Sequence, residues 1–103
     1  MSKKTMFYMK ECAPIFSMLQ DERRQEITQL LFENRELSVS SLTEKLSLSR
    51  PAVSHHLKLL LDTGLVTVRQ EGKERYYQLN LKTALDQLKN LTASIEKDIE
   101  QMK

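Results

Sequence analysis

The chain has 103 residues, 40% of them hydrophobic, which is enough for one modest core and too little chain for two independent domains. The single cysteine, Cys12, excludes an intramolecular disulfide, and no group of Cys and His residues has the spacing of a zinc site. The net charge of +2 does not by itself indicate nucleic acid, and no apolar run approaches the roughly 18 residues of a membrane span. The first residues are too polar for a signal-peptide core, so we expect one cytoplasmic domain over residues 1–103 with no membrane partner.

Two helices are predicted in the first third of the chain. The first covers residues 10–19, where apolar residues recur at helical spacing and Pro14 can kink the axis. These apolar residues are Met9, Ala13, Phe16 and Leu19. The second helix begins after Asp21, a predicted N-cap, and ends near Asn34, a predicted left-handed terminator. Its core-facing stripe consists of Ile27, Leu30 and Leu31.

Residues 40–62 are predicted to form a helix, a short turn and a second helix. Residues 41–44, Ser-Leu-Thr-Glu, match a capping box that opens a brief helix ending near Ser47. Pro51 is tolerated in the first turn of the next helix because its missing N–H is not needed there. Gly64 closes that helix, whose buried stripe consists of Val53, Leu57 and Leu60.

The last third is predicted to form a hairpin and a final helix. In residues 65–79 apolar and polar residues alternate with a period of two, which predicts a β-hairpin with its turn at residues 71–73. Asn80 is the predicted N-cap of a helix over residues 81–102, along which apolar residues follow the four-three spacing of a coiled coil. This seam consists of Leu81, Leu85, Leu88, Thr92, Ile95, Ile99 and Met102.

The seam is longer than a small core can bury, so we expect a homodimer formed through the first and last helices. The alternative is that the seam covers the core of its own domain. The predicted interface residues are Phe16, Leu85, Leu88, Ile95 and Ile99.

This order of elements, mostly α with a β-hairpin wing, predicts a winged helix-turn-helix, whose second helix enters the DNA major groove. Residues 11–44 carry three basic and seven acidic residues, whereas residues 45–75 carry six basic and three acidic ones. Arg can pair bidentately with guanine, and Ser and His can bind base edges or phosphates. The predicted DNA-binding residues are Ser49, Arg50, Pro51, Ser54, His55 and Lys58 at the second helix, and Arg69, Lys73 and Arg75 on the hairpin.

The resemblance to a known family rests on several segments. Residues 46–60 are LSLSRPAVSHHLKLL and residues 63–66 are TGLV, and together they resemble the recognition helix of the ArsR/SmtB repressors. Residues 72–79, GKERYYQL, are similar to the wing of that family, and LQDERR at 19–24 is similar to the start of its second helix. The resemblance covers roughly residues 12–80 and implies a dimeric repressor on a palindromic operator. The resemblance also implies that four residues contact the bases or their flanking phosphates: Arg50, Pro51, Ser54 and His55.

The same comparison argues against a metal site. Metal-sensing members of the family often carry cysteines at positions matching Ser38 and Ser40, where hydroxyls replace the thiolates that soft metals prefer. The last helix, residues 81–103, has no histidine for the zinc site of other members. His55 and His56 are adjacent, so they point about 100° apart on a helix and cannot readily share an ion. We therefore expect no metal and no cofactor, and the sequence names no inducer.

Alternative interpretations stay open for other features. The polar face of residues 50–58 could be an ordinary solvated surface, and the chain could be a protein-interaction winged helix without DNA binding. That module would be expected to lack the basic face and wing. Cys12 is either an inert small hydrophobe, which we favour, or a redox sensor forming a disulfide across a dimer, and His56 is expected to be partly buried. An enzyme is not expected, because the chain has neither a Gly-rich phosphate loop nor carboxylates paired near a histidine.

Overall fold

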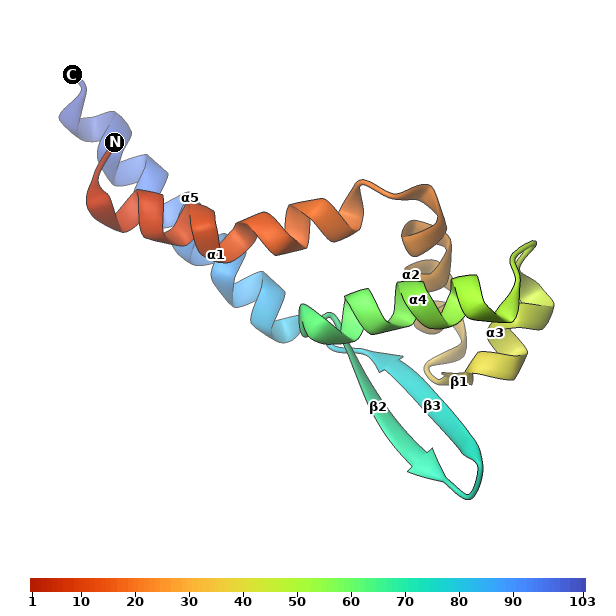
Figure 1. The fold of residues 1–103 in the computed structure, drawn as a ribbon. Helices are drawn as coiled ribbons and strands as arrows, with labels where there is room; N and C mark the ends of the chain where they lie inside the picture. Colours follow the sequence, from red (N-terminus) through yellow and green to blue (C-terminus); the bar gives the residue numbers. More distant parts are fainter.

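The computed structural model describes residues 1–103 and contains five helices and one three-stranded antiparallel sheet (Figure 1). The elements in chain order are α1 (Lys3–Leu19), α2 (Glu22–Asn34), β1 (Leu37–Ser38), α3 (Val39–Lys45), α4 (Arg50–Asp62), β2 (Val66–Glu71), β3 (Glu74–Leu79) and α5 (Lys82–Gln101). The strand order is β1-β3-β2, and the β2–β3 hairpin projects away from the helices as a wing. The predicted fold class, a mostly helical winged helix-turn-helix, is confirmed. No helix combines the length and the apolar character needed to cross a membrane.

The hydrophobic core lies where α2, α3, α4 and the base of the sheet meet, with the second half of α1 and the first turn of α5 against it. The predicted stripe of α4 is confirmed, since its three members are at most 2% exposed: Val53, Leu57 and Leu60. In α2, Ile27 and Leu31 are buried as predicted, whereas Leu30 is only partly buried. Burial of these stripes fixes which side of α4 faces outward.

Four local signals in the sequence act as predicted. The Asp21 carboxylate caps α2 by accepting hydrogen bonds from the backbone N–H groups of the second and third residues after it. Pro51 lies in the first turn of α4. Gly64 and Gly72 have φ of +80° and +62°, a left-handed conformation that a side chain would strain, and they end α4 and turn the wing.

The predicted starts of two helices are wrong, because in each helix a serine earlier in the chain provides the N-cap. α1 begins at Lys3 rather than residue 10, because the Ser2 hydroxyl caps it by accepting from the Thr5 N–H at 3.1 Å. α3 begins after Ser38, whose hydroxyl accepts from the Ser41 N–H at 3.1 Å, so the cap lies three residues before the predicted box. A helix cap depends on a single hydrogen bond, and more than one serine near the start of a helix can match the capping pattern. The sequence pattern alone therefore does not decide which serine is the cap.

α2 ends at Asn34 as predicted, but the structural roles predicted for two asparagines are wrong. Asn34 ends α2 but remains helical, and the left-handed residue is Arg35, with φ of +65°. Asn80 does not cap α5, since Leu81 holds the cap position; the Asn80 amide instead donates to the carbonyl of Gly64 at 3.3 Å. That bond fastens the end of the wing to the end of α4.

α1 and α5 pack antiparallel into an arm with both chain termini at its tip (Figure 1). The antiparallel direction follows from two hydrogen bonds, Ser2 N–H to the Asp98 carboxylate at 3.1 Å and Cys12 Sγ to the Gln87 carbonyl at 3.4 Å. Figure 1 shows that α1 bends along its length, as expected for a helix that contains Pro14. The chain is elongated, with extents of 56 × 24 × 20 Å.

The predicted seam of α5 is not the face that packs against α1. That buried face consists of Ala84, Leu91 and Ser94, and the seam lies one position further around the helix. Leu85 and Ile99 are about half exposed, at 48% and 49%, whereas Leu88 and Ile95 are partly buried. α1 has the same arrangement, with Cys12 and Ile15 buried and Phe16 45% exposed. The alternative that the seam covers the core of its own chain is therefore not favoured.

Candidate DNA-binding surface

The outward face of α4 carries the predicted polar residues. The Ser49 hydroxyl caps α4 by accepting from the Ala52 N–H at 3.3 Å, so this side chain has a structural role at the first turn. The remaining predicted residues of this helix are all exposed: Arg50, Pro51, Ser54, His55 and Lys58. They lie at the N-terminal end and along the side opposite the buried stripe, as their spacing predicts.

Two of these cations have partners on the surface. Arg50 Nη1 donates to the hydroxyl of Ser40 at 2.9 Å, which joins the start of α4 to the start of α3. Lys58 Nζ lies 3.4 Å from a carboxylate oxygen of Asp62, one turn along the same helix, and both side chains are more than half exposed. An exposed ion pair contributes little to stability, so Lys58 can exchange Asp62 for a phosphate.

The wing and α4 together line a concave surface of about 510 Å³. α4 contributes Arg50, Ser54 and Lys58, and the wing contributes Lys73 and Arg75. The other lining residues are Val39, Leu61, Asp62 and Tyr77. The only carboxylate of the lining is the one paired with Lys58. The fold thus brings five of the predicted residues, four of them cationic, to one groove.

Arg69, the remaining predicted wing residue, lies on the other face of the hairpin. Side chains of paired residues share a face of a sheet, and Arg69 is paired with Tyr76 whereas Arg75 is paired with Gln70. The Arg69 guanidinium donates two hydrogen bonds to Glu36, at 2.8 and 2.7 Å, and one to Glu71 at 2.7 Å. These bonds raise the pKa of Arg69 above its usual value, and the bond from Arg69 lowers the pKa of Glu36. The structure therefore separates Arg69 from the groove.

Strand alternation was the signal that could have made this distinction from the sequence. Residues 69 and 75 differ by six, but the hairpin register pairs Gln70 with Arg75, so the two arginines point to opposite faces. Sequence reasoning also missed Ser40, which holds Arg50, and Tyr77, which is buried at the base of the groove. The partner of Arg69, Glu36, is 33 positions away and has no local signal.

The two histidines differ as predicted. His55 is exposed and His56 is partly buried, with Nδ1 3.4 Å from Arg24 Nη1. Burial lowers the pKa of His56, so the ring is held in its neutral form. The ring centroids are 6.0 Å apart with planes inclined by 54°. The chain contains no group of three or more His, Cys, Asp or Glu side chains that could hold a metal ion.

Cys12 has the environment of a packing residue. The side chain is fully buried, and its thiol donates to the Gln87 carbonyl of α5. Burial raises the pKa of Cys12, with a smaller contribution from the negative charge of Glu11. Fewer thiolates at neutral pH make oxidation slower, so the inert interpretation is favoured over a redox sensor.

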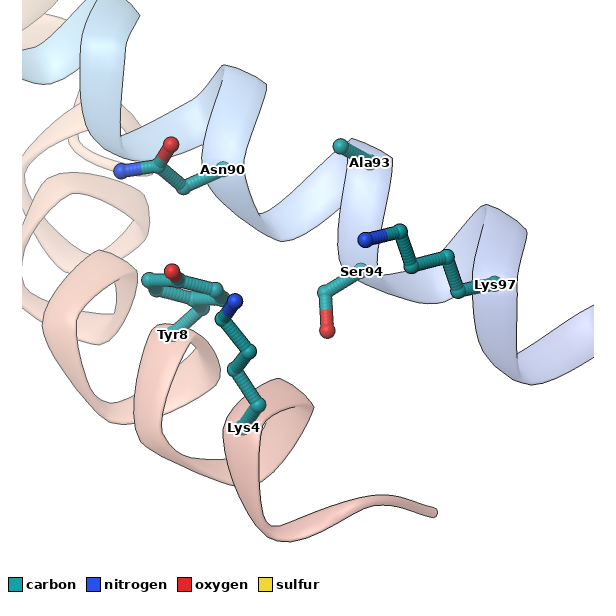
Figure 2. A pocket seen from close by; sticks show the side chains of 6 residues that line it. All are labelled: Lys4, Tyr8, Asn90, Ala93, Ser94 and Lys97. Carbon is teal, nitrogen blue, oxygen red and sulfur yellow. The ribbon is translucent and has the colours of Figure 1, made fainter.

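A second, smaller concavity of about 140 Å³ lies between α1 and α5 (Figure 2). Figure 2 shows Lys4 and Tyr8 of α1 facing Asn90 and Lys97 of α5 across it, with Ser94 between them. The Ser94 hydroxyl is hydrogen-bonded to Thr5, which joins the two helices below this concavity. None of the predicted DNA-binding residues lies here, so the groove between α4 and the wing is the candidate site.

Comparison with known proteins agrees with this geometry. The family described as "Bacterial regulatory protein, arsR family" matches residues 21–68, which run from the cap of α2 into β2. The "Arsenical resistance operon repressor" of Staphylococcus aureus is 42% identical over 82 residues, which cover 80% of this chain and 78% of that protein. Its Staphylococcus xylosus counterpart, with the same description, is 44% identical over 71 residues, 69% of this chain and 67% of that protein.

Solved structures give the same result. The "ArsR-like Transcriptional Regulator from Rhodococcus sp. RHA1" is 32% identical, with a TM-score of 0.74 over 92% of each chain. These proteins are regulators of transcription rather than enzymes. The winged fold, the basic groove and these matches together show that the chain belongs to the ArsR family of DNA-binding transcriptional regulators.

Proposed function

We propose that this protein is a homodimeric repressor that binds a palindromic operator, with α4 in the major groove and the wing along the neighbouring backbone. The observation that carries the proposal is the groove in which Arg50 and Ser54 of α4 face Lys73 and Arg75 of the wing. A helix and a cationic β-hairpin that line one groove can contact base edges and phosphates at the same time. Repression is inferred from the staphylococcal relatives, whose descriptions are those of operon repressors.

The predicted DNA-binding residues of α4 and the wing divide by what they can reach. Arg50 and His55 lie on the exposed face of α4, where a guanidinium can pair bidentately with guanine and an imidazole can bind a base edge. The N-terminus of α4 presents the positive end of the helix dipole, which favours a phosphate. Lys73 and Arg75 are on the wing and are assigned to phosphates or the minor groove.

The proposed dimer is supported by the arrangement of α1 and α5. On both helices an exposed apolar row lies one residue, or about 100°, beyond the row that packs between them. Because the helices run antiparallel, the same offset places both rows on the same side of the arm. The combined apolar surface consists of Met6, Met9, Phe16 and Leu19 of α1 and Leu85, Leu88, Ile95 and Ile99 of α5. We propose that a second copy of the chain covers this surface, with the same residues of both copies in a two-fold symmetric interface.

The proposal does not include a metal-thiolate switch at the positions where metal-sensing members of the family often carry cysteines. Ser38 and Ser40 occupy the matching positions, and their hydroxyls are used otherwise: one caps α3, and the other accepts the hydrogen bond from Arg50. Cys12, the only thiol of the chain, is buried between α1 and α5. The proposal therefore names no inducer.

The experiment that tests this function is selection of fragments of the source genome by the purified protein, followed by footprinting and measurement of stoichiometry. We expect enriched fragments to share an inverted repeat, with half-sites separated by roughly one helical turn, 10–10.5 base pairs, and two chains bound per site. Fragments with no shared sequence, or a single half-site holding one chain, would contradict the proposal.

A further inference from the structure

A strained turn precedes the sheet. Arg35 has φ of +65° and ψ of −49°, and the N–H of Glu36 donates to the Asn34 carbonyl at 2.7 Å. Together these features define a γ-turn of the positive-φ kind, which is rare for residues other than glycine. Such a turn persists when surrounding contacts fix its conformation. It places Glu36 directly before β1, at the edge of the sheet.

Arg69 reaches Glu36 from the opposite edge of the sheet. The strand order is β1-β3-β2, so the Arg69 side chain of β2 has to cross β3 to reach the edge at β1. On its way the guanidinium lies 4.6 Å from the centroid of the Tyr76 ring of β3. It then donates through Nε and Nη2 to the two carboxylate oxygens of Glu36, while Nη1 donates to Glu71. Glu36, Arg69 and Tyr76, which we call the brace, thus connect β2 and β3 to the residue directly before β1.

The brace acts where the wing has little other support. β1 contributes only two pairs to the sheet, Leu37 with Tyr77 and Ser38 with Tyr76, and it continues directly into α3. The hairpin extends beyond this short contact, so a small change in its tilt displaces the cations near its turn by a larger distance. A bidentate ion pair with fixed geometry resists such a tilt better than a single contact does.

We infer that the brace positions the wing relative to α4 and that Arg69 is a positioning residue rather than a DNA contact. The inference rests on the proposed function, because it concerns how the wing meets DNA. If Arg69 left the brace for a phosphate, the carboxylates of Glu36 and Glu71 would lose their counterion close to the DNA. Arg69 also lies on the face of the hairpin that points away from the groove.

The two roles of Arg69 predict opposite effects of Glu36→Gln on operator affinity. If Glu36 only neutralised a DNA-contacting arginine, its removal would free that arginine and tighten binding. If the brace positions the wing, the same variant should weaken operator binding by about three- to tenfold despite the lost negative charge. The matched control is Glu74→Gln, which removes the same charge, but from a carboxylate of the hairpin that forms no ion pair.

A double-mutant cycle completes the test. Arg69→Gln should weaken binding about as much as Glu36→Gln, and the double variant should lose no more than the larger single loss, because the residues act through one contact. Glu74→Gln should bind as tightly as the unmodified protein or more tightly. Unchanged or tighter binding by Glu36→Gln, or independent effects in the cycle, would overturn the inference and leave Arg69 as a phosphate contact.

A measurement on the free protein distinguishes failure of the brace from failure of the proposed function. The Nε–H signal of Arg69 in a nitrogen-15 NMR spectrum should be protected from exchange without DNA, lost in Glu36→Gln and retained in Glu74→Gln. An unprotected signal in the unmodified protein would show that the brace does not form. A protected signal in a protein that selects no operator would instead contradict the proposed function alone.

Discussion

The bond between Arg50 and Ser40 prepares the residue that we assign to base recognition. A free arginine side chain has many rotamers, and restricting it on binding costs free energy. The bond of 2.9 Å between Arg50 Nη1 and the Ser40 hydroxyl limits that freedom before DNA arrives. It also connects the two helices of the helix-turn-helix unit.

The cations of the wing are expected to behave differently from those of α4. Lys73→Ala and Arg75→Ala should each weaken operator and unrelated DNA about equally, because phosphate contacts carry no base information. Each variant should also reduce the slope of log affinity against log salt by roughly one unit. Binding isotherms at several salt concentrations check both expectations. A variant that lost only operator binding would have a base contact in place of a phosphate contact.

His56 is expected to make folding stability depend on pH. Burial lowers its pKa below the ordinary 6.5, the nearby Asp21 acting in the opposite direction, so the unfolded chain takes up a proton first as the pH falls. This contribution to stability is fully present above about pH 6.5 and is lost as the pH falls through the lower, folded pKa. Denaturant unfolding at several pH values should show the loss in the unmodified protein and not in His56→Gln.

His55 supplies the matched control for this measurement. It is exposed on the next position of α4, so His55→Gln should leave the pH dependence of the unfolding free energy as in the unmodified protein. If His55→Gln removed the dependence and His56→Gln kept it, the assignment of the buried titrating group would be wrong.

At the scale of elements, α1 and α5 are expected to hold the dimer. Leu88→Lys with Ile95→Lys would place unpaired charges in the proposed interface, which is strongly unfavourable, so the dimer should dissociate. Thr83→Lys is the control, because residue 83 is exposed on the far side of α5 from this seam. Sedimentation measures the outcome. A stable monomer of the unmodified protein at micromolar concentration would contradict the proposed dimer.

α4 and the wing could be predicted from the sequence because their signals are local. Pro51 lies in the first turn of α4, where its missing N–H is tolerated, and Gly64 and Gly72 have the positive φ that favours glycine where α4 ends and the hairpin turns. The starts of α1 and α3 could not be placed, since Ser2 and Ser38 compete with nearby polar residues for the cap and tertiary packing decides.

The candidate site was predictable in part for the same reason. The outward face of α4 follows from one buried stripe, and that stripe is visible in the sequence. The different position of Arg69 depends on the strand register and on a partner, Glu36, that lies far away in the chain. The ion pair with Glu36 leaves no periodic pattern in the sequence, whereas the face on which Arg69 lies follows from strand alternation once the hairpin register is known.

At the scale of the whole molecule, the arm of α1 and α5 and the groove lie at different places on an elongated chain (Figure 1). We expect operator affinity to be the same with chelator, zinc, cadmium or arsenite, because hydroxyls of Ser38 and Ser40 stand where thiolates would be needed. Operator binding measured with each additive checks this. A saturable loss at low stoichiometry would contradict it, and Cys12→Ser would then show whether the buried thiol takes part.

The central claim is that α4 reads bases in the DNA major groove. Its most direct test is the comparison of Arg50→Ala with the unmodified protein on operator and scrambled DNA. We predict a loss on the order of 1–3 kcal/mol on the operator, relaxed preference at particular base pairs and little change on scrambled DNA. A parallel loss on both DNAs with unchanged base preference would contradict the claim for Arg50 and make it a phosphate clamp. Sequence reading would then have to come from Ser54, His55 or DNA shape.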